Sequence, residues 1–240
     1  MSHSPISYRE MWQQKPVLRA IYSDIYRRML AQTVPGPILE IGGGSGNFKA
    51  FAPDTVSSDI MPASWLDLVC DAQRLPFAAG SFSNVVMVDV LHHIEFPVRA
   101  LRSIADVLRP GGRLIMCEPA ITPVSGVFYH HFHPEPVDMT ADPLVDGVIS
   151  PDKDPFDSNQ AIPTLLTGRY REALSRAVPD LVLESTDRFS FFAYPLSGGF
   201  RPWSAIPASL VGPALQAEWA IRHILGPLAA FRLLAIYRKA

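Results

Sequence analysis

The chain has 240 residues, of which 48% are hydrophobic, so it is long enough for one α/β domain with a full core. Its formal net charge is −2 and its Lys and Arg residues are scattered, which excludes nucleic acid as an expected partner. The two cysteines lie in apolar, strand-like runs, which predicts buried free thiols and a reducing, cytoplasmic location.

Residues 1–30 are polar and aromatic with mixed charge, so we expect no signal peptide. The most apolar region, residues 203–237, is interrupted by prolines and charged side chains, and we expect no membrane span there. Two interpretations of this region remain open. It contacts a membrane or a lipid-linked acceptor, or it is a helix and a strand that cover the sheet, and the second is favoured.

In the first half of the chain, hydrophobic periodicity predicts helices and strands in alternation. The expected elements are a helix at 8–31, a strand at 38–41, a short helix within 47–52, strands at 55–60, 66–70 and 82–90, a helix at 97–108 and a strand at 113–117. Residues 109–112, Arg-Pro-Gly-Gly, are expected to end the last helix in a turn. Five strands with short or helical connections predict a doubly wound parallel sheet.

The second half of the chain is less regular. Residues 119–165 are rich in Pro and His and show little periodicity, which is typical of a lid or a substrate loop. Beyond them we expect a helix at 169–177, a strand at 181–194, a proline-broken helix at 207–225 and a closing strand at 231–237.

The most informative motif is PILEIGGGSGNF at residues 37–48. An apolar strand carries Glu40 to its carboxyl end, and Gly42, Gly44 and Gly46 then permit a tight turn that can approach a ligand closely. This E-x-G-x-G-x-G spacing differs from G-x-G-x-x-G, in which a helix N-terminus binds a pyrophosphate. Because Glu40 would repel a phosphate, the motif favours a neutral or cationic ligand.

Each of the five predicted strands of the first half ends on or beside an acidic residue. In chain order these residues are Glu40, Asp59, Asp71, Asp89 and Glu118. Parallel strands bring their carboxyl ends to one edge of a sheet, where ligands bind. Five acids in register predict a binding site at that edge.

With these motifs in this order, the chain resembles the class I S-adenosylmethionine-dependent methyltransferases, in particular the type-11 group related to ubiquinone and menaquinone biosynthesis. The matching segments are EIGGGSG, SSDI, CDAQRLPF, SFSNVVMVDVLHHI and LRPGGRLIMCEP, within residues 37–119. The resemblance implies a Rossmann-like, doubly wound, seven-stranded α/β sheet with an N-terminal helix, in a single domain over 1–240. Its parts would be a cofactor-binding half (37–119), an irregular cap or substrate loop (120–165) and the completion of the sheet (166–240).

The resemblance also implies S-adenosylmethionine as the cofactor and methyl transfer to an oxygen, nitrogen or carbon of a small-molecule acceptor. The turn with Gly42 and Gly44 would lie against the methionine and ribose, and Glu40 would fix the methionine end. Asp59 would accept hydrogen bonds from the ribose hydroxyls. The remaining contacts would come from Asp71 and the backbone of Ala72 at the adenine edge, from Ile60 and Met61 beside the adenine plane, and from residues 88–90, including Asp89, at the methionine end.

Two departures from the family pattern stand out. Only eight residues separate Asp59 from Leu68, which is too few for the usual helix, and the helix after the glycine turn is also short. We therefore expect a thinner adenine wall at Ile60 and Met61.

Two histidines follow the fourth predicted strand, on the ligand side of the sheet. Methyl transfer to an acceptor requires alignment and often the removal of a proton, and a histidine titrates in the right range. His93 is therefore the candidate base, and the alternative is that His92 and His93 only pack against their surroundings.

The stretch His130-His131-Phe132-His133-Pro134-Glu135 looks like a group of metal ligands. No Cys pair accompanies it, and its spacing is not that of a common zinc site, so no metal is expected. A role in the acceptor pocket or lid is favoured over a metal site, and ordinary loop histidines are the remaining alternative.

Two other functional classes stay open. A Rossmann-type oxidoreductase that binds NAD(P) or another nucleotide would use a similar sheet, although the carboxylate pattern argues against it. A non-catalytic relic would bind the cofactor without turnover. The sequence leaves the acceptor, the methylated atom and the oligomeric state open.

Overall fold

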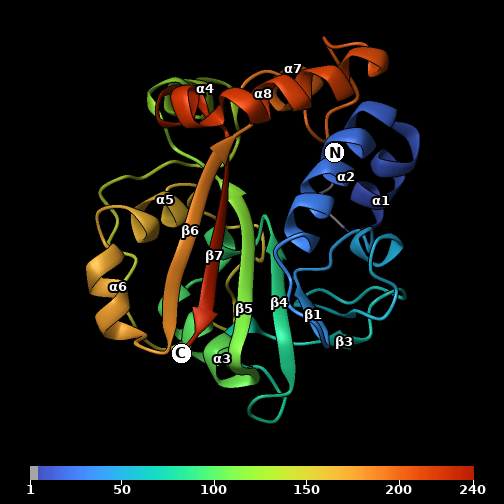
Figure 1. Ribbon diagram of the computed structural model, residues 1–240. Coiled ribbons are helices and arrows are strands. Elements are labelled where there is room, and N and C mark those ends of the chain that lie inside the picture. Colours follow the sequence, from blue (N-terminus) through green and yellow to red (C-terminus); the bar gives the residue numbers. More distant parts are fainter. Residues whose placement is uncertain (1–4) are drawn as a thin grey trace.

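The computed structural model describes residues 5–240, and the first four residues of the predicted domain lie outside this range (Figure 1). A single seven-stranded sheet has the order β3-β2-β1-β4-β5-β7-β6. The strands are β1 (Ile38–Ile41), β2 (Val56–Asp59), β3 (Leu68–Val69), β4 (Phe82–Val88), β5 (Leu108–Pro119), β6 (Leu181–Phe189) and β7 (Arg232–Lys239). β1 to β5 pair in parallel, and β7 runs antiparallel between β5 and β6. The predicted seven-stranded α/β sheet is confirmed.

Helices cover both faces of the sheet. They are α1 (Pro5–Gln14), α2 (Pro16–Leu30), α3 (Pro97–Val107), α4 (Pro123–Phe132), α5 (Ile162–Thr167), α6 (Arg171–Ala177), α7 (Ala193–Ser197) and α8 (Ala208–Ala229), with short 3₁₀ turns η1 (Phe48–Ala50), η2 (Ala72–Arg74) and η3 (Leu91–His93). The single helix predicted at 8–31 is two helices, because Pro16 at the start of α2 cannot continue α1.

Alternate residues of each central strand point to opposite faces of the sheet and build two cores. On one face Val85, Met87 and Leu114 pack with α3, α5 and α6. On the other face Val86 and Ile115 pack with α2 and the inner side of α8. A layer of α4, α7 and α8 lies beyond the carboxyl end of β5 (Figure 1).

Several predicted boundaries are wrong for identifiable reasons. Residues 109–112 belong to β5 rather than to a turn. Leu108 already pairs with Phe82, and the strand register shifts before Arg113 pairs with Asn84, so that residues 109–112 form a bulge. β6 ends at Phe189 because Ser190 has a φ of 66°, which extended strands do not adopt.

The predicted irregular cap contains α4 and the first part of α5, and the predicted break in α8 does not occur. Thr122 and Ser125 cap the start of α4 reciprocally, and a proline occupies its first turn. α8 is continuous past Pro213 and Pro227, which lie near its two ends. No helix within residues 5–240 has both the length and the apolar character needed to cross a bilayer.

The two departures expected near the glycine turn are confirmed. The connection between β2 and β3 contains no helix, and η1 is only three residues long. Cys70 and Cys117 are free, as predicted, although only Cys117 is fully buried.

Candidate active site

A cavity of about 800 Å³ lies at the carboxyl edge of the sheet. Its floor is the glycine loop after β1 and the ends of β2, β3 and β4. Its upper walls come from α1, α4 and the loops at 149–156 and 198–203. The structure therefore joins the predicted cofactor residues and the predicted cap around one space, as the strand-end acids indicated.

The glycine loop is held in a conformation that only glycine adopts easily. Gly42 and Gly46 have φ values of 75° and 72°, and a Cβ there would come within 2.1 Å of Val90 and 2.4 Å of Trp65. Trp65 donates a hydrogen bond from Nε1 to the Gly44 carbonyl (2.9 Å). The loop is thus shaped by close neighbours as well as by its own turn.

Arg9 fastens the same loop to the N-terminal helix. Its guanidinium stacks over the Trp65 ring at 4.4 Å and donates to the Ser45 carbonyl at 3.2 Å. Neither Arg9 nor Trp65 was a predicted site residue. The shortened connection between β2 and β3, which places Trp65 beside the loop, was the available signal.

Asp59 faces the cavity from the end of β2. Its two carboxylate oxygens accept backbone hydrogen bonds from Gly44 (2.8 Å) and Met61 (2.9 Å). A carboxylate has about four acceptor positions, so Asp59 retains capacity for ligand hydroxyls. Ile60 is exposed beside it, at the cavity wall where the sequence placed an adenine face.

Asp71 caps the start of η2. It accepts hydrogen bonds from the Gln73 backbone (2.8 Å) and from the Gln73 side chain (3.1 and 3.2 Å). Ala72 follows it, buried against the core but at the cavity wall. Both predicted residues lie at this cavity, and their roles toward a ligand stay predictions.

Glu40 is buried below the glycine loop and accepts a hydrogen bond from the Ser57 hydroxyl. Burial raises the pKa of this carboxyl to about 7, and the nearby charge of Asp59 adds to the effect. Its Oε2 would lie 3.1 Å from a Cβ at Gly43. Glu40 therefore gains a full charge only when a cation stabilises it or the pH is high.

Asp89, at the end of β4, is paired within the protein. It binds Arg232 through both oxygens, with 2.7 Å between Nη2 and Oδ2, and accepts a hydrogen bond from Tyr22 at 2.9 Å. Burial raises the pKa of Asp89, but Arg232 outweighs burial and holds the pKa below its usual value. Its predicted contact with a cofactor stays a prediction.

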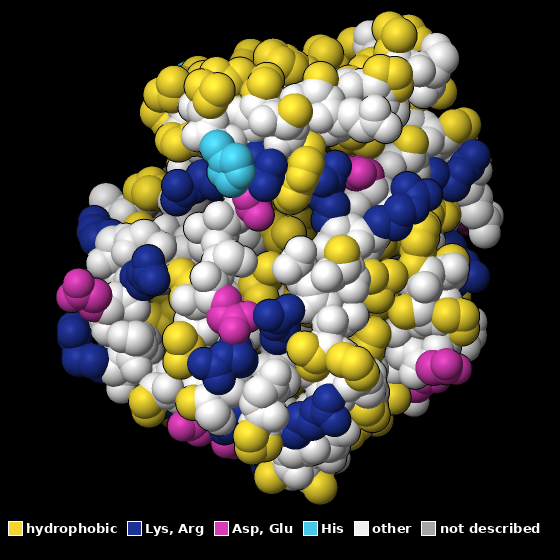
Figure 2. All heavy atoms as spheres, viewed as in Figure 1, with side chains coloured by type: hydrophobic (Ala, Val, Ile, Leu, Met, Phe, Trp, Pro, Cys, Tyr) yellow, Lys and Arg dark blue, Asp and Glu magenta, His cyan; other side chains and the backbone are white. Residues whose placement is uncertain are grey.

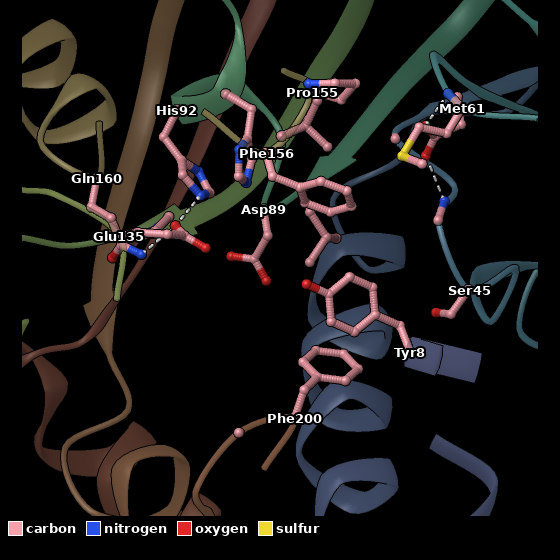
Figure 3. A pocket seen from close by; sticks show the side chains of 18 of the residues that line it. Tyr8, Ser45, Met61, Asp89, His92, Glu135, Pro155, Phe156, Gln160 and Phe200 are labelled. Carbon is pink, nitrogen blue, oxygen red and sulfur yellow. Dashed lines mark hydrogen bonds and ion pairs between the residues drawn. The ribbon is translucent and has the colours of Figure 1, made fainter. Parts of the chain in front are cut away.

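His92, in η3, bridges the sheet and the cap. Nδ1 lies 2.7 Å from Glu118 and Nε2 lies 3.4 Å from Glu135 (Figure 3). Burial by itself would lower the pKa of His92. The hydrogen bonds to the two carboxylates outweigh burial and raise the pKa to about 10. His92 is therefore a cation held between Glu118 and Glu135, and Gln160 supports Glu135 with a 2.7 Å hydrogen bond.

His93 lines the cavity beside this cluster. Burial and the neighbouring His92 cation lower the pKa of His93, so its imidazole is neutral at pH 7. Its Nδ1 is buried and makes no hydrogen bond within the described residues. The predicted base thus lies at the cavity wall in the right protonation state, with its Nδ1 enclosed by the protein.

His130, His131, His133 and Glu135, for which no metal was expected, do not come together in the structure. His130 and His131 are exposed at the end of α4, whereas His133 and Glu135 turn toward the cavity. The groups that come together are His92, His93 and Glu135, whose potential ligand atoms lie within 4.8 Å of one another. His92 and Glu135 already form an ion pair there.

Three comparisons agree with this geometry. Residues 39–116 match the family described as a methyltransferase domain. The chain is thus similar to a methyltransferase domain over 78 of its 240 residues. The match covers the glycine loop and the ends of β2, β3 and β4, which are the elements that line the cavity floor.

Curated relatives match over short segments. A demethylmenaquinone methyltransferase of Mycobacterium marinum is 48% identical over 58 residues, 24% of this chain and 25% of that protein. The ubiquinone/menaquinone biosynthesis C-methyltransferase UbiE of Bordetella parapertussis is 32% identical over 102 residues, 34% of this chain and 40% of that protein. The chain thus aligns with less than half the length of these relatives.

Solved structures match over nearly the whole length. An S-adenosylmethionine-dependent methyltransferase from Thermotoga maritima has a TM-score of 0.56 at 16% identity, covering 96% of this chain and 94% of that one. The [4+2]-cyclase SpnF has a TM-score of 0.52 at 17% identity, covering 92% and 81%. At these identities the likeness establishes the fold, and the reaction has to be argued from the site.

Proposed function

We propose that the chain transfers a methyl group from S-adenosylmethionine to an oxygen, nitrogen or carbon atom of a small, apolar acceptor. The supporting observation is the distribution of acids at the floor of the cavity. Within residues 5–240, Glu40, Asp59 and Asp71 form no ion pair with Lys or Arg, whereas Asp89 and Glu118 are paired internally. Three acids without a Lys or Arg partner suit a cationic ligand with hydroxyl groups and no phosphate.

The residues present fit this cofactor. Glu40 lies below the loop, and its burial makes ionisation of its carboxyl unfavourable. A positive group of the ligand beside it would offset that cost. Asp59 has acceptor capacity for a ribose diol, and Asp71 with Ala72 offers a polar edge for an adenine. When bound, S-adenosylmethionine supplies an electrophilic methyl group on a sulfonium.

The acceptor side of the cavity is aromatic. Tyr8 of α1 lies 4.8 Å from Phe200 and 6.4 Å from Phe156, measured between ring centroids (Figure 3). These three rings come from three separate segments of the chain and face the cavity. They favour an apolar ring or chain as acceptor, consistent with the quinone-biosynthesis names of the curated relatives.

His93 is the proposed proton acceptor. Its neutral imidazole can take a proton from an acceptor hydroxyl, amine or activated carbon as the new bond to the methyl group forms. The ion pairs of His92 with Glu118 and Glu135 fix η3 and the cap segment on either side of His93. The protein thereby aligns the acceptor and excludes water from the reacting groups.

Methyl transfer can be measured as release of S-adenosylhomocysteine. The purified chain is incubated with S-adenosylmethionine and hydroxylated aromatic compounds, with and without an isoprenoid chain. Release that depends on one acceptor supports the proposal. Binding of S-adenosylmethionine without release of S-adenosylhomocysteine in the presence of any acceptor or of a host metabolite extract would favour the non-catalytic alternative.

A cytoplasmic location stays a prediction that rests on the two free thiols.

A further inference from the structure

The outer side of α8 carries an apolar stripe at helical spacing. Large and small apolar residues recur at intervals of three and four, and they are Leu210, Pro213, Ala217, Ile221, Ile224 and Leu228. All of them are exposed, and Ile224 is 75% exposed. The opposite side of α8 is also apolar, with Val211 and Leu215 buried against α2. A helix that is apolar on both sides is not expected to face water.

α4 extends this stripe into a broader surface. It packs beside α8, and its outward residues Val124, Val127 and Phe132 are exposed. Figure 2 shows hydrophobic side chains gathered over the layer of α4, α7 and α8, and below them a band of Lys and Arg side chains with a few Asp and Glu among them. We call the exposed apolar side chains of α4 and α8, together with Trp203, the apolar face.

Acidic side chains are absent from the exposed part of this face. Residues 120–132 contain no Asp, Glu, Lys or Arg, and Glu218 is the single acid in 190–229. Glu218 is buried and accepts backbone hydrogen bonds from Phe192 (2.6 Å) and Ala193 (2.7 Å). The Glu218 carboxyl therefore caps the start of α7 and is not exposed on the apolar face.

The cavity reaches the surface at this apolar face. Phe132 and Trp203 both line the cavity and are 62% and 46% exposed. Arg201, between them in the cavity wall, donates a hydrogen bond to the Phe132 carbonyl (3.0 Å) and leaves a cation at the rim. An apolar compound that passes between the face and the cavity would meet the side chains of Phe132 and Trp203, with Arg201 as the cation at this rim.

We propose that the apolar face docks on the surface of a lipid bilayer, with α4 and α8 lying in the plane of the headgroups. Interfacial helices of this kind bury their apolar side several ångströms into the acyl boundary, and a cation at the rim, here Arg201, meets anionic headgroups. The docking itself does not depend on the proposed function. Only the passage of the acceptor beside Phe132 and Trp203 rests on it.

A bilayer fits the face better than a second copy of the chain does. A copy seated across α4 and α8 would cover Phe132 and Trp203 and close the cavity on this side. A bilayer would cover the same side chains and also hold an apolar acceptor at the rim. Arg201 at the rim forms no ion pair within the described residues, and neither α4 nor α8 offers it an exposed acid in a second copy.

Vesicle flotation with the full chain tests the docking. Vesicles of phosphatidylcholine with phosphatidylglycerol are floated with the wild type, with the double variant I224E/L228E and with V182E. Val182 is also exposed, but it lies at the start of β6, seven residues from Phe189 and on the order of 20 Å from α8. Circular dichroism melting and S-adenosylmethionine binding report whether each variant is folded.

We expect the wild type and V182E to float, and I224E/L228E to partition at least about tenfold less while keeping its melting temperature. Wild-type protein that stays at the bottom, or I224E/L228E that floats as the wild type does, would overturn the proposal. So would a dimer that is lost in I224E/L228E without any vesicle binding. None of these results depends on methyl transfer, so each is distinguishable from failure of the proposed function.

Discussion

Arg232 at the start of β7 and Asp89 at the end of β4 form a bidentate ion pair at the carboxyl edge of the sheet, although they are 143 residues apart in the sequence. The Arg232 side chain is only 1% exposed. It also lies over the Tyr194 ring at 4.7 Å. Asp89 has a φ of 58°, a conformation that non-glycine residues rarely adopt, so the pair fixes an unusual backbone where the cavity begins.

Breaking this pair should destabilise the protein. Arg232→Ala leaves the partly buried Asp89 carboxylate without its partner, and we expect the free energy of unfolding in urea to fall by about 3 kcal/mol. Arg238→Ala on the same strand removes a pair with Glu184 that is largely open to solvent, and should cost about 0–1 kcal/mol. Equal losses in the two variants would contradict a structural role for the Asp89 pair.

Asp59 should contribute directly to cofactor affinity. Asp59→Ala removes an acceptor for the ligand hydroxyls, so we expect calorimetric binding of S-adenosylmethionine to weaken by about 1–3 kcal/mol. Asp54→Ala, at an exposed position before the same strand, should leave the affinity unchanged. Unchanged affinity in Asp59→Ala would show that the strand-end assignment is wrong.

Glu40 should make cofactor affinity depend on pH. Since its pKa is raised to about 7, ligand-free protein holds this proton below pH 7, and a bound cation should favour its release. We expect the affinity for S-adenosylmethionine to rise about tenfold from pH 6 to pH 8. In Glu40→Gln this part of the pH dependence should vanish; a profile like that of the wild type would place the cation elsewhere.

The same group affects stability without ligand. A raised pKa in the folded state means that the folded protein binds the Glu40 proton more tightly than the unfolded chain does. Stability from this group is therefore present below about pH 4.5 and is lost as the pH rises toward 7. Relative to Glu40→Gln, the wild type should therefore have a higher free energy of unfolding at pH 5 than at pH 8.

His93 should affect turnover rather than cofactor binding. If it takes the acceptor proton, His93→Ala should lower kcat by about 100-fold or more with little change in the dissociation constant of S-adenosylmethionine. His130→Ala, at the exposed end of α4, is the matched control and should retain full activity. Wild-type turnover in His93→Ala would reduce His93 to a packing residue.

Local signals explain what the sequence predicted well. Alternating apolar runs that end in acids located β1, β2 and β4 and the cavity edge where Asp59 and Asp71 lie. Local sequence patterns could not predict the contacts that residues distant in the sequence make at this edge. Trp65 reaches the glycine loop from a connection that lacks a helix, and Arg232 reaches Asp89 only after β7 inserts beside β5.

The cap shows the opposite situation. α4 was missed because Gly126 and several histidines weaken its helical pattern, and its capping box uses Ser125 where the usual signal is Glu or Gln. Glu135 could not be paired with His92 from spacing, since the two meet only when the cap folds over η3.

Equilibrium dialysis of the folded chain against S-adenosylmethionine, S-adenosylhomocysteine and NADPH tests the central claim most directly. The unpaired acids at the cavity floor predict one bound molecule of S-adenosylmethionine or S-adenosylhomocysteine per chain and no uptake of the phosphate-bearing NADPH. Uptake of NADPH in preference, or no uptake of either sulfur compound by folded protein, would contradict it.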